Sequence, residues 1–344
     1  MSGTSLDGID LAELHFSVSE KNTWSFEIGI AETIAYPTIW KNNLQNAISY
    51  SEVKMKGFNK EYTLYLGEVI SEFINRNNLK NIDAVCSHGH TIWHQPKNGM
   101  TLQIGNLPEI STLINQKVVC DFRVQDVALG GNGAPLVPIG DRLLFNKYDY
   151  CLNLGGFANI SFEEEGKRIA YDISPINIVL NVLAEKLGFP YDNGGELAKK
   201  GKVDNSLFLQ LNKLKYYKKI APKSLGLEWV QENIFSLLEA SEATILDKIA
   251  TMTEHVAFQL ALQFQEKTSV LVTGGGAFNS YLLERVQFYK KLDLIVPSEK
   301  IIEYKEALIF GLLGVLKLRN EINCLASVTG ATQNHSSGKI FNPN

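Results

Sequence analysis

Residues 1–10 read Met-Ser-Gly-Thr-Ser-Leu-Asp-Gly-Ile-Asp, and the apolar pattern of a strand resumes directly after them. Gly3 and Gly8 enclose small hydroxyl residues and Asp7, so this stretch predicts a tight turn whose backbone amides can converge on an anion. A carboxylate at such a turn, Asp7 or Asp10, can hold the Mg²⁺ that accompanies ATP. The alternative interpretation is an ordinary hairpin turn rich in glycine, serine and aspartate.

A hairpin needs a strand on each side of its turn, and here the turn begins at the first residue of the sequence. The apolar positions from Ile9 to Phe16 supply only the second of these two strands. Either a first strand stands in front of Met1 or the hairpin is built differently, and we expect the first strand.

Length and composition are those of a globular protein with two domains. With 344 residues, 45% of them hydrophobic and 20% charged, the chain can build two cores. A formal net charge of −4 argues against a nucleic-acid or anionic membrane surface, and no apolar run of the sequence reaches the length of a bilayer span. The four cysteines have no metal or redox spacing, which indicates reduced thiols and a cytoplasmic protein. They are Cys86, Cys120, Cys151 and Cys324.

Hydrophobic periodicity predicts a mixed α/β chain, in which antiparallel hairpins are followed by an alternation of helices and strands. Strand-like runs occur at residues 9–17, 25–35, 83–87, 101–105, 117–122, 150–154, 158–163, 168–172, 269–273 and 293–296. Helical periodicity occurs at residues 61–76, 175–187, 206–215, 228–239, 242–265, 280–289 and 305–317.

A second glycine-bearing turn lies in residues 151–162, Cys-Leu-Asn-Leu-Gly-Gly-Phe-Ala-Asn-Ile-Ser-Phe. Gly155 and Gly156 let the backbone approach a ligand closely, and Asn159 lies just past the tip. Two domains that each contribute one such turn would face each other across a cleft. A hairpin with a Gly-Gly turn is also common for structural reasons alone.

Residues 271–279, Leu-Val-Thr-Gly-Gly-Gly-Ala-Phe-Asn, end an apolar strand in three glycines and lead through Asn279 into a helix. Bare backbone here allows a flat ligand such as a nucleoside to lie against it, and the helix N-terminus favours negative charge. The spacing is not that of the dinucleotide-binding G-x-G-x-x-G motif. A glycine-rich turn without a ligand is the alternative.

Two segments carry carboxylates that are candidates for binding or catalysis. The loop 120–138 carries Asp121, Arg123 and Asp126, and the arginine can bind a carboxylate-bearing ligand with two hydrogen bonds or form a structural pair with an aspartate. Asp172 ends the strand-like run 168–172, where a carboxylate suits a general base that activates water or a sugar hydroxyl. The alternative for Asp172 is a cap on the following helix.

The segment Ser87-His-Gly-His-Thr91 is followed by Trp93 and His94. No further ligand completes a recognisable metal site, so hydrogen bonding of a substrate by His88 or His90 is the favoured interpretation, with Trp93 stacking on a sugar face.

Taken together these segments resemble the anhydro-N-acetylmuramic acid kinase family of the actin/Hsp70/sugar-kinase superfamily, over nearly the whole chain. The resemblance rests on Gly3–Asp10, Ser87–Thr91, Trp93–His94, Leu102–Gly105, Asp121–Arg123, Gly130–Pro138, Asn153–Asn159, Pro222–Ser224, Gly274–Gly276 with Asn279, Glu306–Leu308 and Ser327–Ala331. Around Asp172 the chain departs from the family pattern Thr-Gly-Pro-Gly-Asn, because Ile173-Ser-Pro-Ile-Asn177 replaces both glycines. Asn132 and His90 stand where glutamines are usual.

The resemblance implies an α/β fold of the two-domain actin/Hsp70-like (ribonuclease H-like) ATPase type, with an interdomain cleft. Domain I would comprise residues 1–130 with 318–344, and domain II residues 131–317. The implied reaction opens 1,6-anhydro-N-acetylmuramic acid with water and phosphorylates the freed O6 from ATP–Mg²⁺, giving N-acetylmuramic acid 6-phosphate in peptidoglycan recycling. The expected partner is a small-molecule amino sugar. The resemblance implies neither a nucleic-acid nor a membrane partner, and it implies a possible homodimer.

The resemblance also assigns residues to roles. Asp172 matches the catalytic aspartate, and Asp7 is the candidate Mg²⁺ ligand. The candidate ATP-binding residues are Gly3, Thr4, Ser5, Leu6, Asp7, Gly8, Ile9, Asp10, Gly155, Gly156, Asn159, Gly274, Gly275, Gly276 and Asn279. The candidate substrate-binding residues are His88, Gln103, Asp121, Arg123, Asp126 and Glu306. Two alternatives are a plain sugar or amino-sugar kinase that uses Asp172 or Asp126, and an inactive nucleotide-binding module.

Overall fold

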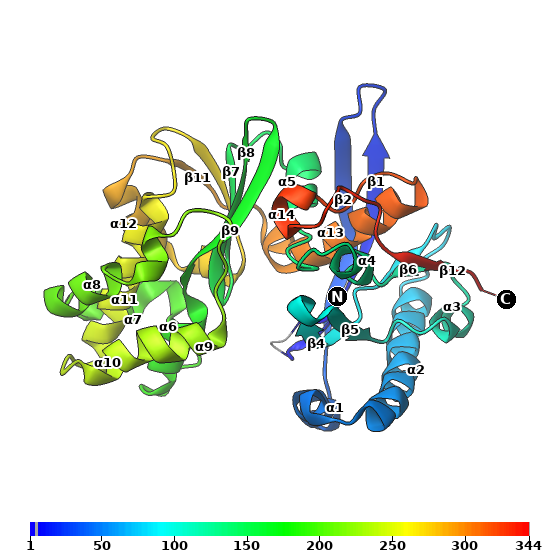
Figure 1. Cartoon of the computed structure of the whole chain (residues 1–344), viewed down its shortest axis with the longest axis horizontal. Coiled ribbons are helices and arrows are strands. Elements are labelled where there is room, and N and C mark those ends of the chain that lie inside the picture. Colours follow the sequence, from blue (N-terminus) through cyan, green and yellow to red (C-terminus); the bar gives the residue numbers. More distant parts are fainter. Residues whose placement is uncertain (4–5, 344) are drawn as a thin grey trace. The chain divides into compact units, whose positions relative to one another are not determined.

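The computed structural model describes residues 1–3 and 6–343, which form two compact units. Unit 1 comprises residues 1–144 and 304–344, and unit 2 comprises residues 145–303. The chain therefore passes between the units at positions 144/145 and 303/304, whereas the sequence led us to expect 130/131 and 317/318. Figure 1 shows each unit with its own strands and helices.

Unit 2 is built on a five-stranded sheet with the order β11-β10-β7-β8-β9. Its antiparallel half joins β7 (Tyr150–Leu154), β8 (Phe157–Glu164) and β9 (Lys167–Pro175) by tight connections. Its parallel half adds β10 (Ser269–Thr273) to β7 and β11 (Asp293–Ile295) to β10. β7 is thus the central strand, and its carboxyl end leads directly into the Gly155–Gly156 turn.

A helical layer supplies the core of unit 2. The helix α11 (Ile245–Ala261) is buried along most of its length, and Thr244 caps it by accepting a hydrogen bond from the Asp247 amide at 3.2 Å. The strand side chains Leu152, Leu154 and Ile160 pack against this layer in one apolar cluster. The other helices of unit 2 are α6 (Asn177–Glu185), α7 (Glu196–Lys200), α8 (Asn205–Asn212), α9 (Leu227–Val230), α10 (Ser236–Ala240) and α12 (Ser280–Tyr289).

The strands of unit 1 form three separate groups. β1 (Gly8–Val18) pairs antiparallel with β2 (Trp24–Ala35), and β4 (His90–Gln95) pairs antiparallel with β5 (Met100–Ile104). The third group has the order β12-β6-β3, in which β3 (Val85–Cys86) runs parallel to β6 (Val118–Cys120). β12 (Lys339–Phe341) runs antiparallel to β6.

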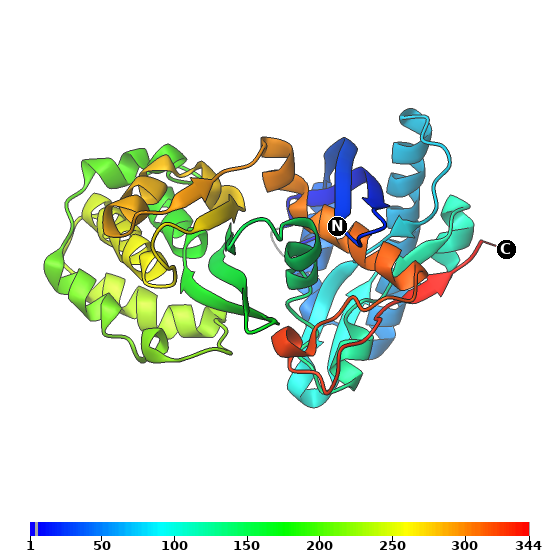
Figure 2. The ribbon, with the colours of Figure 1, turned by 90° about the horizontal axis from the view of Figure 1, so that it is seen from above.

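Two long helices cover these strands. The helix α2 (Glu52–Arg76) buries one face against an apolar cluster that includes Ile9 of β1 and Val118 of β6. The helix α13 (Glu299–Leu318) runs beside β1 and β2 (Figures 1 and 2), with Gly311 so close to Leu14 that a Cβ there would lie 2.4 Å from its side chain. Shorter helices of unit 1 are α1 (Thr38–Asn46), α3 (Glu109–Ile114), α4 (Val124–Ala128), α5 (Pro138–Leu144) and α14 (Ala326–Thr329).

A buried ion pair joins two distant segments of unit 1 beside the points where the chain leaves and re-enters it. Lys305 Nζ lies 2.8 Å from Asp141 Oδ1, and both side chains are almost completely buried. Asp141 belongs to α5 and Lys305 to α13, so the pair holds these two helices together. A buried pair of this kind costs more to break than to keep, because either charge alone would be left desolvated.

The expected α/β class is confirmed, with antiparallel hairpins first and helix–strand alternation later. The strand β4 of the hairpin β4–β5 was not expected, because the periodicity of residues 90–95 does not indicate a strand. α2 begins at Glu52, before the expected residue 61, because Ser51 caps it and its first turn is exposed. Among the described residues, no helix is long and apolar enough to cross a membrane.

Candidate active site

Asp172 lies in β9 and is half-buried. Its Oδ2 accepts a hydrogen bond from the Leu225 amide at 2.9 Å, and its backbone oxygen accepts one from Tyr216 Oη at 2.6 Å. Burial raises the pKa of the Asp172 carboxyl, and the hydrogen bond from Leu225 opposes this increase. A rigidly held carboxylate with a raised pKa suits a general base.

Asp172 belongs to a row of polar side chains that crosses the sheet of unit 2. Asn153 of β7 pairs with Asn159 of β8, and Asn159 pairs with Asp172 of β9. Directly paired residues of neighbouring strands point to the same face of a sheet. The register therefore places Asn159, expected at the second phosphate turn, beside the expected catalytic carboxylate.

The second turn itself leaves room for a ligand. A Cβ added at Gly155 or Gly156 would have no neighbouring heavy atom closer than 3.4 Å. The turn is fixed from behind, because Ile176 donates its amide to the Gly156 carbonyl at 2.8 Å and Asn177 Nδ2 donates to the Leu154 carbonyl at 3.2 Å. Its backbone is thus held in place while its outer side remains open.

The three glycines after β10 have different surroundings. A Cβ at Gly274 would lie 2.7 Å from Asn153 Oδ1, and one at Gly276 would lie 2.7 Å from Leu154 Cβ. Gly275 has no such neighbour within 4 Å. Gly274 and Gly276 are therefore required for close packing on β7, and Gly275 is the position where open backbone is presented. Asn279 is buried and caps α12, accepting from the Leu282 amide at 3.0 Å.

A loop that the sequence analysis missed lies beside this turn. Gly194 and Gly195 have positive φ, and the Gly194 carbonyl accepts a hydrogen bond from Ser280 Oγ at 3.2 Å. A Cβ at Gly195 would lie 2.6 Å from Asn279 Oδ1. The signal was available as Asn193-Gly-Gly195 between two helical segments, a pattern that indicates left-handed backbone.

In unit 1, the turn of residues 1–10 is anchored at its start. Ser2 Oγ lies 2.7 Å from Tyr36 Oη and 2.8 Å from His90 Nδ1, and Tyr36 continues the network to Tyr62. Gly8 is required by close packing, since a Cβ would lie 2.4 Å from the Ile34 carbonyl oxygen. Thr4 and Ser5, two of the expected phosphate-binding residues, lie outside the described residues.

The carboxylates of the first turn differ in exposure. Asp7 is exposed, whereas Asp10 is half-buried and its Oδ1 accepts a hydrogen bond from Thr33 Oγ1 at 2.7 Å. Gly3 and Leu6 close the turn through a hydrogen bond from the Leu6 amide to the Gly3 carbonyl at 3.3 Å, and Ile9 is buried in the core.

His88 and Arg123, two of the expected substrate-binding residues, contact each other directly. Arg123 Nε donates to His88 Nε2 at 3.0 Å, and Arg123 Nη1 donates to the Gly133 carbonyl at 2.7 Å. His88 Nδ1 lies 3.0 Å from the Gly89 carbonyl, so the neutral ring carries its proton on Nδ1. Burial first, and then the charge of Arg123, lower the pKa of His88 well below its usual range.

Glu306 contributes a negative charge to the same group. Its pKa is raised, first by desolvation and also by the charge of Asp10, while the charge of Arg123 opposes the increase. The ring of Phe310, one turn further along α13, lies 5.7 Å from Arg123 Cζ and 4.6 Å from the His88 ring. Unit 1 thus brings together a cation, a neutral imidazole and a carboxyl.

The remaining expected substrate contacts are more enclosed. Asp126 is fully buried, and its carboxylate accepts hydrogen bonds from the Gly133 amide and from Thr329 Oγ1, both at 2.7 Å. Asp126 therefore fixes the loop around Gly133, whose carbonyl accepts the hydrogen bond from Arg123. Asp121 forms an ion pair with Lys339 at 2.9 Å and not with Arg123. Gln103 is buried and donates from Nε2 to Thr101 Oγ1 at 2.9 Å, and none of the residues that the structure describes is a hydrogen-bond partner of its Oε1.

The sheet order of unit 2, its open Gly-Gly turn and the polar row on β7, β8 and β9 that ends in the Asp172 carboxylate are an arrangement that suits an α/β phosphotransferase. The chain belongs to the anhydro-N-acetylmuramic acid kinase family, whose model matches residues 1–343. It is accordingly an ATP-dependent kinase.

Relatives of this name resemble the chain over its full length. The anhydro-N-acetylmuramic acid kinase of Sulfurimonas denitrificans is 32% identical over 99% of this chain and 98% of its own. The enzyme of the same name from Bacillus cereus strain ATCC 10987 is 31% identical over 100% and 98%. Among solved structures, the activator of the 2-hydroxyisocaproyl-CoA dehydratase from Clostridium difficile, with bound ADPNP, covers 90% of this chain and 96% of its own at 13% identity, with a TM-score of 0.43.

Proposed function

We propose that this protein converts 1,6-anhydro-N-acetylmuramic acid, water and ATP to N-acetylmuramic acid 6-phosphate and ADP, as a step of cell-wall peptidoglycan recycling. Family membership supports the substrate and the donor. The observation that carries the chemistry is the half-buried Asp172, whose raised pKa and position in the polar row of β7, β8 and β9 suit the base that the reaction needs.

Asp172 would accept the proton from a water molecule whose oxygen bonds to the anomeric carbon. The bond between that carbon and O6 breaks as the new bond forms, and O6 takes the γ-phosphoryl group of ATP. The proton then leaves Asp172 for solvent, so one base serves a step that both hydrolyses and phosphorylates. The hydrogen bond from the Leu225 amide keeps the carboxylate directed while its charge changes.

Unit 2 would bind the nucleotide through the open backbone of Gly155, Gly156 and Gly275, with Asn159 at the phosphates. The loop Asn193–Gly195 beside Asn279 would border the nucleoside. In unit 1, the turn of residues 1–10 would bind phosphate with Asp7 and Asp10 as the acidic residues. Carboxylate oxygens are the donors that Mg²⁺ prefers, and the ion would neutralise charge that develops on the transferred phosphoryl group.

The sugar carries a carboxylate on its lactyl group, and Arg123 is the residue that suits it. His88 and the Gly133 carbonyl hold two of its N–H donors, which fixes the plane of the guanidinium and directs the remaining donors. Glu306 and Gln103 Oε1 are acceptors for sugar hydroxyl or amide groups. Asp126 and Asp121 would act indirectly, through the Gly133 loop and through Lys339.

The test is turnover of 1,6-anhydro-N-acetylmuramic acid and ATP in ¹⁸O-water, with mass spectrometry of the sugar product. One ¹⁸O at the anomeric hydroxyl and one phosphate are expected in the wild type. Asp172→Asn should lower kcat by a factor of about 10² to 10⁴. Asp293→Asn, an exposed aspartate of the same sheet, is the matched control and should retain activity.

Each other outcome assigns a different function. Phosphate transfer only to unbridged sugars would identify a plain sugar kinase. ATP binding without turnover by folded protein would identify a nucleotide-binding module. The use of ATP supports a cytoplasmic location, and the homodimer implied by the resemblance is testable by light scattering.

A further inference from the structure

Three metal-binding side chains from separate parts of the sequence meet inside unit 1. They are Asp126 of α4, Cys324 and His335, and the most exposed of them, His335, is only 6% exposed. One ligand atom of each, a carboxylate oxygen, the thiol sulfur and an imidazole nitrogen, lies within 4.8 Å of the other two. Because Asp126 is far from the other two residues along the chain, the spacing of residues in the sequence does not indicate this cluster.

Cys324 and His335 form an antiparallel bridge, which fixes the direction of both side chains. The Cys324 amide donates to the His335 carbonyl at 3.0 Å, and the His335 amide donates to the Cys324 carbonyl at 3.2 Å. Residues that are paired directly in this way point to the same face. Asn323 holds the bridge further, because its Oδ1 accepts from the Ser337 amide at 2.7 Å and its Nδ2 donates to the Ser337 carbonyl at 2.9 Å. The backbone therefore presents the sulfur and the imidazole side by side.

The hydrogen bonds of His335 leave its Nε2 as the atom that faces the cluster. Nδ1 lies 3.1 Å from the Gln333 carbonyl oxygen, which can only accept, so Nδ1 carries the proton of the neutral ring. Nε2 is buried, and none of the described residues is a hydrogen-bond partner of this atom. A histidine that binds a metal ion has the same arrangement, in which the other ring nitrogen donates to a carbonyl or a carboxylate.

The Asp126 carboxylate faces this nitrogen, with Oδ1 at 3.6 Å from Nε2. The carboxylate is fixed, because Oδ1 accepts from Thr329 Oγ1 and Oδ2 accepts from the Gly133 amide, both at 2.7 Å. A separation of 3.6 Å is too long for a hydrogen bond, and an unprotonated nitrogen repels a carboxylate oxygen unless a cation lies between them. Bonds of about 2.0–2.3 Å to a tetrahedral zinc ion place two ligand atoms about 3.3–3.6 Å apart.

The donor set identifies the class of metal ion. A thiolate, an imidazole and a carboxylate are ligands of Zn²⁺, whereas Mg²⁺ takes oxygen ligands. The thiolate and the carboxylate would balance the two charges of the ion. Burial and the charge of Asp126 raise the pKa of the Cys324 thiol to about 12, and a hydrogen bond with Ser337 and the charge of Arg123 oppose this increase. Zinc binding would therefore release the thiol proton.

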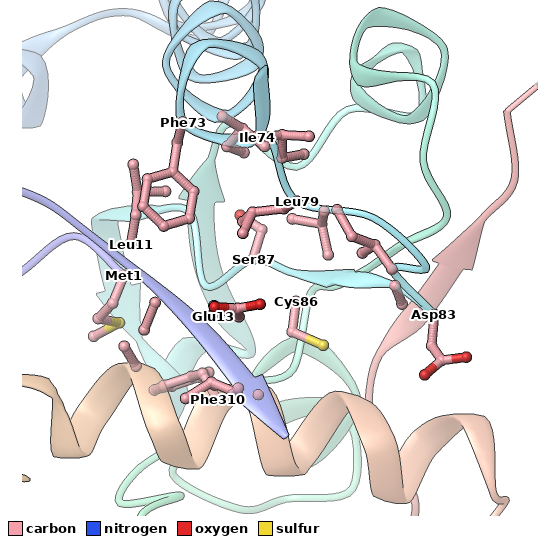
Figure 3. A pocket seen from close by; sticks show the side chains of 18 of the residues that line it. Met1, Leu11, Glu13, Phe73, Ile74, Leu79, Asp83, Cys86, Ser87 and Phe310 are labelled. Carbon is pink, nitrogen blue, oxygen red and sulfur yellow. The ribbon is translucent and has the colours of Figure 1, made fainter. Parts of the chain in front are cut away.

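The cluster is separate from the large cavity of unit 1. That cavity has a volume of about 370 Å³, and Figure 3 shows a carboxylate and a thiol, Glu13 and Cys86, at its wall. None of the three cluster residues lines it. In the part of the chain that the structure describes, Asp126, Cys324 and His335 are the group of histidine, cysteine and acidic side chains that is close enough to share one ion.

We propose that Asp126, Cys324 and His335 bind one Zn²⁺ ion, with a water molecule as the fourth ligand. The ligand atoms would close by about 1 Å or less around the ion. The role is structural, because the ion would join the bridge of Cys324 and His335 to α4 and hold the carboxylate that fixes the Gly133 amide. This site lies outside the proposed function and does not depend on it.

The experiment uses the full chain, freed of metal with a chelator and then titrated with Zn²⁺ or Co²⁺. Competition with a chromophoric chelator in excess Mg²⁺ should give one Zn²⁺ per chain with a Kd of about 1 µM or lower. Co²⁺ should give the visible bands of tetrahedral coordination and an ultraviolet thiolate-to-cobalt charge-transfer band. Zn²⁺ at about 100 times its Kd should raise Tm by about 5 °C.

Variants assign the ion to the cluster. Cys324→Ser should remove the charge-transfer band, and Cys324→Ser and His335→Leu should each weaken zinc binding about 100-fold or more. The matched controls are Cys86→Ser, a free cysteine outside the cluster, and the exposed His15→Gln, and both should keep the band and the Kd of the wild type. X-ray absorption of the zinc-loaded wild type should show one sulfur at about 2.3 Å, with nitrogen and oxygen at about 2.0–2.1 Å.

Three results would overturn the proposal. A charge-transfer band that persists in Cys324→Ser would assign the ion to another thiol. Absence of the band and of stoichiometric zinc from the wild type would leave the cluster as an ion pair between the His335 imidazolium and the Asp126 carboxylate. A zinc shell without sulfur in the wild type would exclude the site even if both ligand variants fail to fold. None of these readouts uses catalysis, so they are independent of whether the enzyme turns over its substrate.

Discussion

The guanidinium of Arg123 shows how much of the candidate site is decided at single residues. Its donors to His88 and to the Gly133 carbonyl are fixed within hydrogen-bond distance, and the Asp126 carboxylate fixes Gly133 in turn. The fully buried Asp126 thus acts on the loop and not on a ligand, which a linear reading of Asp121, Arg123 and Asp126 does not distinguish.

His88→Leu should weaken sugar binding, because it leaves the Arg123 Nε–H without its acceptor. The KM for the anhydro sugar is expected to rise about tenfold, which corresponds to the loss of one charge-assisted hydrogen bond. The KM for ATP should stay within about twofold. His88→Gln, which keeps an acceptor, should recover part of the loss, and His15→Leu is an exposed control. Equal effects on both KM values would contradict this role.

The raised pKa of Asp172 predicts the acid limb of the pH–rate profile. The carboxylate is the active form of a base, so kcat/KM should fall as pH decreases through the pKa of Asp172. Because burial raises this pKa, the fall should begin at a higher pH than an ordinary aspartate would give. Profiles of kcat/KM from pH 4 to 8 check this, and Asp172→Asn should lose the limb from its residual rate.

Among the elements, the turn after β10 has neighbouring glycines with different roles. Gly274 and Gly276 are needed for packing, and Gly275 is available for binding. Gly276→Ala would force a Cβ to 2.7 Å from Leu154 Cβ, so it should lower the free energy of unfolding by about 1–3 kcal/mol. Gly275→Ala meets nothing within 4 Å, so it should leave Tm nearly unchanged and raise the KM for ATP. Thermal unfolding and ATP titration of the two variants measure both effects. A stable Gly275→Ala enzyme with unaltered ATP affinity would exclude nucleotide contact at this turn.

Elements with strong local patterns were predictable from the sequence, and those defined by distant contacts were not. The bounds of β7, β10 and α12 agree with their apolar patterns. The segment His90–Gln95 has histidines, threonine and glutamine around two apolar residues, and it is a strand because β5 pairs with it. The loop Asn193–Gly195 is separated from Asn279 in sequence, so its place beside the glycine turn depended on packing.

For the whole molecule, two buried histidines predict loss of stability in acid. Burial lowers the pKa of His90 in unit 1 to about 4 and that of His255 in unit 2 to about 3, below the usual 6.5. The unfolded chain therefore binds more protons below pH 6.5, and each histidine should cost about 3 kcal/mol of stability by pH 4. Urea unfolding at pH 7, 5.5 and 4.5 measures this.

Substituting each histidine separately measures how much of the stability lost in acid comes from each unit. His90→Gln and His255→Gln should each make the free energy of unfolding less dependent on pH below 6.5. His255 lies 2.8 Å from Tyr217 Oη and 3.0 Å from Asn212 Oδ1, so its variant also tests whether a neutral amide replaces these contacts. A pH dependence that neither variant changes would assign the acid loss to other groups, His88 or carboxylates among them.

The ion pair of Asp141 and Lys305 has a consequence for how the two units are connected along the chain. The two crossings of the chain, after Leu144 and before Tyr304, are held at one place by this pair, so unit 2 has the topology of a cassette inserted into a single loop of unit 1. Unit 2 can therefore be removed as one continuous segment, residues 145–303, and a short linker can join the two ends of unit 1 that remain. Recombination at these two junctions would exchange the segment that carries Asp172 and the Gly-Gly turn while leaving the residues around Arg123 in their own framework.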